Sequence, residues 1–381
     1  MGKTKERRDH EEYEEYWKFT AAWTDIYGIK FNKALRITIH FIDKNIKSIE
    51  ESASLENFRE STLYDELQKE LVYAFGWSGS DPEANARKGI NTFVKLGFIN
   101  PFLNGYHPLA KKFVNAKNDD ERCILFSKIF YDSASFASGV TNDRRSVNYL
   151  AFLLRTLSYN KSLNKEDIKA LMITDINQYP KGYLNKEELE SQLRESVLID
   201  FEERKYNQIS HLMSFLKSFS DIHYSSSEDR IYFADDPDIA EDEINEKFHC
   251  DPIKLRLHRQ ELLEESRELY GAEVCYLEKK PYKGLRDSHI KPKQLCVDEG
   301  NEEQAYDVNN GILLSPNTDQ YFDKFDISFN DDGKILMGNG VAPEIKMELQ
   351  TMKLGEEVLT EQRKRYLAYH RARFFEKNGE K

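Results

Sequence analysis

The stretch from Arg286 to Asp323 limits what this chain can fold into more than any other part of the sequence. It begins within the segment Leu285 to Ile290, which has the length and composition of a short strand. Successive side chains of a strand point to opposite faces, so Asp287 and His289 are predicted to share one face and Ser288 to lie on the other. The chain is therefore expected to present an acid and an imidazole side by side on a small sheet.

A helix is predicted shortly after this strand. Ser315 and Pro316 are typical of a helix start, and Asp319 and Asp323 are four residues apart, which places them on one helical face. The neighbouring patterns predict a helix, a strand and a hairpin closed by a tight turn. These segments are Glu261 to Tyr270 for the helix, Glu273 to Tyr276 for the strand, and Phe325 to Phe329 with Lys334 to Met337 for the hairpin.

His289, Asn310 and Asp319 thus occur in the order strand, loop, helix. This order, with the residues around each of them, resembles the HNH endonuclease family, the ββα-metal nucleases, and within it a restriction-endonuclease-like branch. The resemblance runs from about Tyr270 to Phe329 and continues weakly into Gln362 to Phe375. The segments that carry it are Ser288 to Pro292, Asn309 to Pro316 and Asp319 to Phe329.

The resemblance implies a role for each of the three residues. His289 matches the general base that deprotonates the attacking water, and a neutral His suits that role at pH 7. Asn310 matches the residue that tethers the loop and orients the base. Asp319 follows nine positions after Asn310, and this spacing favours Asn310 over Asn309. Asp319 itself matches a ligand of a divalent metal ion.

The rest of the implied metal site has more than one candidate. Many relatives carry a carboxylate or a His immediately before the general base, where this chain has Ser288. Asp287, one position earlier, is the nearest carboxylate and is a candidate metal ligand. Asp323 is another candidate. The ion is expected to be Mg²⁺ or Mn²⁺, because oxygen ligands suit hard cations. Lys291 and Lys293, just after the base, are candidates for contacts with DNA phosphates.

No structural zinc is expected. Many relatives carry two C-x-x-C pairs, whereas the four Cys residues of this chain form no such pair. Cys275 is instead expected to be a buried apolar residue. The scattered positions also argue against a disulfide framework, as is typical of a cytosolic protein.

The region before residue 243 is predicted to be mainly helical, beginning with a helix from Glu11 to Ile49. A helix from Asp81 to Leu96, a short hairpin after Gly97 and a further helix have the order of a winged-helix unit, whose middle helix enters the major groove. Arg87 and Lys88 on the first of these helices are candidate DNA contacts.

A similar order appears a second time. Helices between Val147 and Phe219 lead to a hairpin from Ile222 to Phe233, and an acidic connector from Ala234 to Asn245 follows. The predicted domains are a helical, possibly winged-helix, domain over 1–135, a second over 136–242, and a nuclease domain over 243–381. The fold class is therefore α+β and mainly helical, with DNA recognition in the N-terminal region and a ββα-metal domain at the end.

Charge and composition narrow the class of partner. The net charge of −12 argues against a general nucleic-acid coat protein but is compatible with a site-specific DNA enzyme. A hydrophobic content of 39% is enough for folded cores. The first residues are charged, and no apolar run approaches the length of a membrane span. The protein is expected to be soluble and cytoplasmic, without a membrane partner.

These features favour a site-specific endonuclease that hydrolyses phosphodiester bonds of double-stranded DNA with one metal ion and a His base. A type II restriction enzyme, paired with a cognate DNA methyltransferase, is the preferred interpretation. One HNH site cuts one strand, so a homodimer or a transient dimer is expected during cleavage.

Two alternatives stay open. One is a modification-dependent, type IV-like nuclease, in which Trp17, Trp23 and Trp77 could wall a pocket for a flipped base. The other is a DNA-binding regulator that carries an inactive HNH fold, and the presence of His289, Asn310 and Asp319 argues against it.

Overall fold

The computed structural model describes residues 17–52, 58, 60–145, 148–234 and 250–379. The chain separates into two compact units, Met1–Ala234 and Asp235–Lys381. The predicted acidic connector lies outside the described residues from residue 235 onward. The division of the N-terminal region at residue 135 stays a prediction. Among the helices that the structure describes, none is long and apolar enough to cross a membrane.

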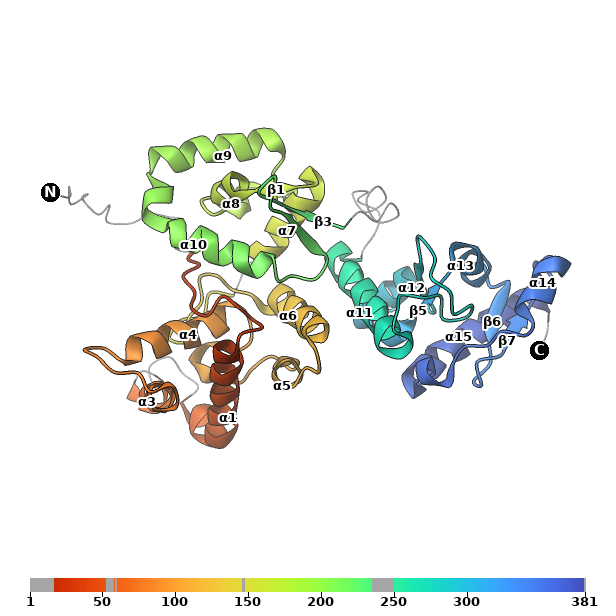
Figure 1. The fold of residues 1–381 in the computed structure, drawn as a ribbon, viewed down its shortest axis with the longest axis horizontal. Helices are drawn as coiled ribbons and strands as arrows, with labels where there is room; N and C mark the ends of the chain where they lie inside the picture. Colours follow the sequence, from red (N-terminus) through yellow and green to blue (C-terminus); the bar gives the residue numbers. More distant parts are fainter. Residues whose placement is uncertain (1–16, 53–57, 59, 146–147, 235–249, 380–381) are drawn as a thin grey trace. The chain divides into compact units, whose positions relative to one another are not determined.

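The first part of the unit Met1–Ala234 is a group of helices (Figure 1). Buried aromatic side chains form its core. Phe31, Phe93, Phe98 and Phe113 meet there edge to face, with centroids 4.7–6.0 Å apart. Phe31, Phe93 and Phe113 lie on helices of this group, and Phe98 lies in the segment after Lys95. The elements are α1 (Ile29–Glu51), α3 (Leu63–Phe75), α4 (Glu83–Lys95), η2 (Pro101–Leu103), α5 (Ala110–Val114) and α6 (Asp119–Ser133).

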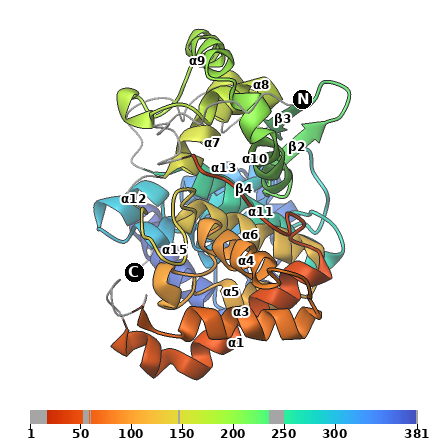
Figure 2. The same ribbon diagram turned by 90° about the vertical axis from the view of Figure 1, so that its left-hand side faces the viewer.

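The second part of this unit combines helices with a small sheet (Figure 2). The strands lie in the order β1-β3-β2 and all pairs are antiparallel. Asn164 and Asn185 each begin a helix with a reciprocal capping box, to Asp167 and Glu188. The elements are α7 (Tyr149–Asn160), β1 (Leu163–Asn164), α8 (Lys165–Leu171), η3 (Ile176–Gln178), α9 (Lys186–Leu198), α10 (Phe201–Leu216), β2 (Ile222–Ser225) and β3 (Arg230–Phe233).

The predicted hairpin from Ile222 to Phe233 is confirmed by the pairing of β2 with β3. Neither winged-helix prediction is confirmed as such. In the first candidate the hairpin is reduced to an isolated bridge between Ile99 and Tyr106. In the second, the order of helix, strand, helices and hairpin is present, and its assignment as a winged helix stays a prediction.

The predicted helix from Glu11 to Ile49 is wrong over its described first part. Residues 17–25 contain no helix, and α1 begins only at Ile29. The backbone N–H groups of Phe19, Ala21 and Ala22 donate to side chains of Gln208, His211 and Thr92 instead of to carbonyls one turn earlier. The apolar spacing that suggested a helix belongs to a non-helical segment with buried apolar side chains.

The unit Asp235–Lys381 contains two small antiparallel sheets among helices. β4 (Arg286–His289) pairs with β5 (Gly311–Leu314), and β6 (Ile327–Phe329) pairs with β7 (Ile335–Met337). The hairpin predicted from Phe325 to Met337 is therefore confirmed. The helices are α11 (Pro252–Tyr270), α12 (Lys293–Asp298), η4 (Glu302–Tyr306), η5 (Val308–Asn310), α13 (Pro316–Asp323), α14 (Pro343–Leu349), η6 (Glu356–Val358) and α15 (Glu361–Asn378).

The strand predicted at Glu273 to Tyr276 is wrong. The chain turns there, with Lys279 N–H bonded to the Cys275 carbonyl and Lys279 at a positive φ of 55°. The partner of β4 is β5, four buried residues that pair with it from Arg286–Leu314 to His289–Gly311. The expected proximity of Asp287 and His289 on one face survives this change, because both stay on β4.

Two buried contacts tie the terminal helix α15 to the rest of this unit. The guanidinium of Arg363 is fully buried and binds both carboxylate oxygens of Glu265 on α11, at 3.1 and 2.9 Å. His370 lies flat on Phe322 with ring centroids 3.9 Å apart. α15 therefore contacts both α11 and α13, the two helices beside β4.

Candidate active site

The end of β4 and the start of α13 lie against each other. The Ser288 hydroxyl on β4 donates a hydrogen bond to Asp319 Oδ1 on α13. Ser315 caps α13 by accepting from Thr318 N–H, and Glu278 accepts from the hydroxyls of Ser315 and Thr318 at 2.5 and 2.8 Å. The helix start is thus fixed, and with it the position of Asp319.

A cavity of about 470 Å³ opens beside this contact. It is mainly polar at its β4 and α13 walls, where basic, acidic and imidazole groups converge. Its wall is formed by Leu255, Arg286, Asp287, Ser288, His289, Ile290, Pro292, Lys293, Gln294, Asp319, Asp323, Phe325 and His370. The structure therefore brings His289, Asp319, Asp287 and Lys293, all predicted from the sequence, to one cavity.

His289 is held in a defined orientation at this cavity. Its Nε2 lies 3.0 Å from the Ala305 carbonyl oxygen, which requires a proton on Nε2 in the neutral ring. Nδ1 is then the nitrogen that can accept a proton. Burial, and next the nearby His258, lower the pKa of His289 to about 4. The imidazole is consequently neutral at pH 7, as a general base must be.

Asn310 lies behind the base and does not touch its ring. Its fully buried amide accepts from Lys291 N–H at 2.7 Å and donates to the Lys291 and Gln304 carbonyls at 3.0 and 2.9 Å. The backbone carbonyl of Asn310 accepts from Ile290 N–H at 2.9 Å. Asn310 therefore fixes the two residues that follow His289, which agrees with a tethering role.

Asp287 is engaged by helix α11. Its Oδ1 lies 3.1 Å from Arg259 Nη1, and its Oδ2 lies 3.9 Å from His258 Nδ1. The ring of His258 in turn stacks on His289, with centroids 4.6 Å apart. Asp287 thus shares its face of β4 with His289 but is paired with Arg259, and its role as a metal ligand stays a prediction.

The carboxylates on α13 form the acidic side of the cavity. Burial raises the pKa of Asp319, and burial together with the charge of Asp319 raises that of Asp323 to about 6. Two carboxylates that repel each other in a partly buried site are an oxygen donor set for a hard cation. The Ser288 hydroxyl adds a third oxygen beside Asp319.

This donor set fits a magnesium-like ion only in part. Within the described residues, no three His, Cys, Asp or Glu side chains converge in a way that could hold a metal ion. Mg²⁺ is commonly held by one or two carboxylates, with water and substrate phosphate completing its shell. Asp319 with Ser288 or Asp323 matches that pattern.

The basic residues near the cavity differ in their surroundings. Lys291 is buried, and its amine contacts Glu299 at 2.5 Å and Gln304 at 3.0 Å. Lys293 and Arg286 line the cavity itself. The phosphate contact expected of Lys291 stays a prediction, and its observed partners lie within its own loop.

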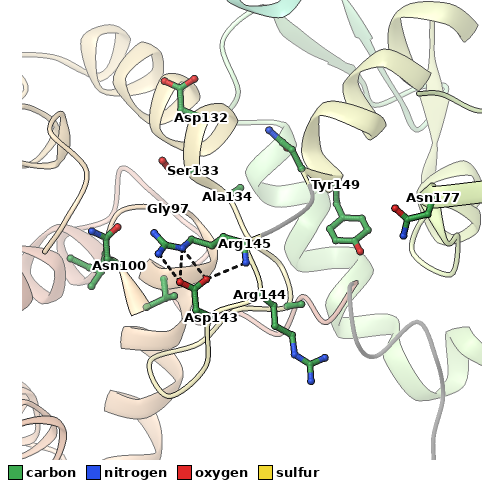
Figure 3. Close-up of a pocket in the computed structure, with 14 residues that line it drawn as sticks. Gly97, Asn100, Asp132, Ser133, Ala134, Asp143, Arg144, Arg145, Tyr149 and Asn177 are labelled. Atoms are coloured by element: carbon green, nitrogen blue, oxygen red, sulfur yellow. Dashed lines mark hydrogen bonds and ion pairs between the residues drawn. The ribbon is translucent and has the colours of Figure 1, made fainter. Parts of the chain in front are cut away.

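The two basic residues predicted on α4 lie in the other unit. Arg87 is paired with Asp81 at 2.5 Å, whereas Lys88 is exposed. That unit also contains a cavity of about 910 Å³ with Asn100, Asp132, Arg144, Tyr149 and Asn177 in its wall (Figure 3). Arg145 and Asp143 form an ion pair of 2.6 Å at the same cavity.

The predicted tryptophan walls are not part of this second cavity. Trp17 is buried and packs on Tyr149 from the core side, with centroids 5.1 Å apart. Trp23 and Trp77 stack on each other and on Phe75 elsewhere. None of the three Trp residues is among those that line the cavity.

Three residues near the candidate base were not predicted from the sequence. His258 and Arg259 come from α11, and Arg286 opens β4. His258 carried a usable signal: a lone His among apolar residues of an amphipathic helix, at a position that the structure shows to be buried. Only the packing of α11 on β4 and β5 relates it to His289.

Two comparisons with known proteins bear on this site. Residues 273–330 match the HNH endonuclease family. The matched segment contains β4, β5 and α13, and hence His289, Asn310 and Asp319. A comparison with curated proteins finds no match for the chain.

Proposed function

We propose that this chain is a site-specific endonuclease of double-stranded DNA, because residues 273–330 match the HNH endonuclease family, which indicates a nuclease acting on DNA. The observation that carries the proposal is the meeting of His289 and Asp319 at one cavity. The neutral imidazole and the acidic helix face are the two parts that metal-assisted phosphodiester hydrolysis needs.

In this mechanism His289 Nδ1 accepts a proton from the attacking water. The Ala305 carbonyl fixes the tautomer, and Asn310 fixes the loop that follows the base. Asp319, with Ser288 and Asp323 nearby, would hold Mg²⁺ or Mn²⁺. When bound, that ion would stabilise the charge on the phosphate and on the leaving oxygen. Arg286 and Lys293 would bind phosphates at the cavity wall.

A type II restriction enzyme is the preferred form of this nuclease. The matched segment alone can carry the chemistry of cleavage, and the unit Met1–Ala234 is far larger than that segment. We assign this unit to DNA recognition. Arg87 and Lys88 stay candidates for phosphate contacts there. Since one site cuts one strand, we propose a homodimer or transient dimer during cleavage, and a cognate methyltransferase that protects the host site.

The test is digestion of unmodified plasmid DNA with Mg²⁺, followed by sequencing of the ends. Discrete ends at one recurring sequence are expected, with no cleavage in EDTA. His289→Ala should abolish cleavage, a loss of at least about 10²-fold for a general base, while DNA affinity is retained. Intact DNA with the wild-type protein, or cleavage by His289→Ala at the wild-type rate, contradicts the proposal.

The polar cavity of the first unit favours a second candidate, a modification-dependent nuclease. Its volume of about 910 Å³ exceeds that of a nucleobase, and Tyr149 with the Asn side chains could contact a base turned out of the helix. Parallel digestion of methylated and unmethylated plasmid separates the two candidates. Cleavage confined to the methylated DNA supports the second one.

A further inference from the structure

A second histidine lies directly against the candidate base. His258 on α11 is 1% exposed, and its ring is stacked on that of His289 at 4.6 Å with an angle of 24° between the planes. His258 lies outside the segment 273–330 that matches the HNH family. Its place beside the base results from the packing of α11 on the strand that carries His289.

The contacts of His258 show how its ring nitrogens and its ring face meet the candidate site. Among the described residues, neither Nδ1 nor Nε2 lies within hydrogen-bond distance of a partner, although both atoms are buried, and the Asp287 carboxylate lies 3.9 Å from Nδ1. Leaving buried polar atoms unpaired destabilises a fold, because those atoms lose their hydrogen bonds to water. His258 therefore meets the site in two ways, through the approach of Nδ1 to Asp287 and through its flat face on His289.

The partner strand leaves room for this ring. Gly311, which pairs with His289 across the sheet, would place a Cβ 2.7 Å from His258 Cε1 and 2.8 Å from Nε2. Any larger residue at position 311 would displace the ring. The absence of a side chain at Gly311 thus makes the stacking of His258 on His289 possible.

The adjacent residue of α11 strengthens the same arrangement. Arg259 binds the Leu285 carbonyl at 2.8 Å and the Asp287 carboxylate at 3.1 Å. Two consecutive residues of α11 therefore hold β4 on either side of Ser288, one through Asp287 and one through His289.

We infer that His258 is a positioning residue for the nuclease reaction: its ring supports the face of His289 and keeps the imidazole in one orientation at the cavity. The inference rests on the proposed role of His289 as the base. With one face against His258 and Nε2 at the Ala305 carbonyl, the imidazole has little freedom to rotate. Misplacing a catalytic group by about 1 Å can lower the rate about 10²-fold.

The test compares His258→Leu, which fills the space without a flat ring, with His258→Phe, which keeps one. His258→Leu is expected to lower kcat about 10- to 100-fold while KM and DNA affinity stay within about 3-fold. His258→Phe is expected to recover most of that loss. Thermal unfolding of both variants checks that each is folded at the assay temperature.

Nitrogen NMR of the His289 ring in the full chain gives a readout that does not depend on cleavage. The wild type and His258→Phe should show the single tautomer with the proton on Nε2, and His258→Leu a mixture of tautomers or a broadened signal. A folded Leu variant with wild-type kcat and spectrum, or a Phe variant as defective as Leu, overturns the inference. If the wild type cleaves no DNA, the proposed function fails, and the spectra still decide whether His258 positions His289.

Discussion

Asn310 pairs with the backbone of Lys291 as a neighbouring strand would, accepting from its N–H at 2.7 Å and donating to its carbonyl at 3.0 Å. This two-way contact closes the loop between the candidate base and β5. It explains why an Asn is required: Asp lacks the donor, and Ala lacks both groups.

Replacing Asn310 should therefore destabilise the C-terminal unit. Asn310→Ala leaves the Lys291 N–H and carbonyl and the Gln304 carbonyl without their partner, and we expect a loss of about 2–4 kcal/mol in the free energy of unfolding. Hydrogen exchange of the segment 285–330, followed by mass spectrometry, measures this loss locally. All three Trp residues belong to the other unit, so their fluorescence cannot report it.

Asn309→Ala is the matched control. The Asn309 side chain lies at the surface side of the same loop, where it contacts Asp307 and Thr360. Its removal should cost less than about 1 kcal/mol. Equal losses for the two variants would show that Asn310 holds no special place in the loop, contrary to its predicted role.

Asp319 should control the metal requirement of cleavage. Asp319→Asn keeps the shape of the side chain but removes a negative charge from the cavity, so the Mg²⁺ concentration for half-maximal activity is expected to rise at least about 10-fold. Metal titrations of plasmid cleavage measure it. Asp326→Asn is the control, because Asp326 is paired with Lys377 at 2.7 Å and is not among the residues lining the cavity. An unchanged titration for Asp319→Asn contradicts its assignment as a ligand.

The sequence predicted the elements that carry the candidate residues, but not every neighbouring strand. His289 lies on β4 and Asp319 on α13, as expected, and Asn310 lies in η5 between them, whereas the catalytic roles of the three residues stay predictions. The strand predicted before β4 failed because the tight turn from Cys275 to Lys280 depends on a positive φ at Lys279, which a Lys seldom adopts.

Other features depended on contacts that no local pattern contains. The non-helical segment after Trp17 is held by side chains of Thr92, Gln208 and His211, which come from helices far along the chain. The stacking of His258 on His289 likewise requires the packing of α11 on β4 and β5. Local periodicity reports which residues are buried, but it does not report which residues from distant segments meet.

Lys293 and Lys291 should affect DNA binding differently. Lys293 lines the cavity, so Lys293→Ala is expected to weaken DNA binding for all sequences and to reduce the slope of log affinity against log salt by about 1. Lys291→Ala removes the contacts with Glu299 and Gln304 and should lower stability with a smaller effect on the slope. Affinities measured at several salt concentrations distinguish these effects. A larger slope change for Lys291→Ala would reverse the assignment.

Lys95 should make the stability of the N-terminal unit depend on pH. Its amine is buried and donates to the Thr20 carbonyl at 3.0 Å, and burial, together with the charge of Lys18, lowers its pKa to about 7. The unfolded chain keeps the ordinary value near 10.5. Between these values the unfolded state binds more protons, so stability rises with pH. The cost of the buried charge is fully present below pH 7 and is relieved above it.

This contribution can be isolated by comparison with Lys95→Met, which keeps the length of the side chain without its charge. Urea unfolding followed by Trp fluorescence reports this unit, since Trp17, Trp23 and Trp77 all belong to it. Between pH 7.5 and 9.5 the wild type should gain up to about 1.4 kcal/mol per pH unit relative to the variant. Parallel curves for the two proteins over this range would mean that Lys95 keeps an ordinary pKa in the folded state.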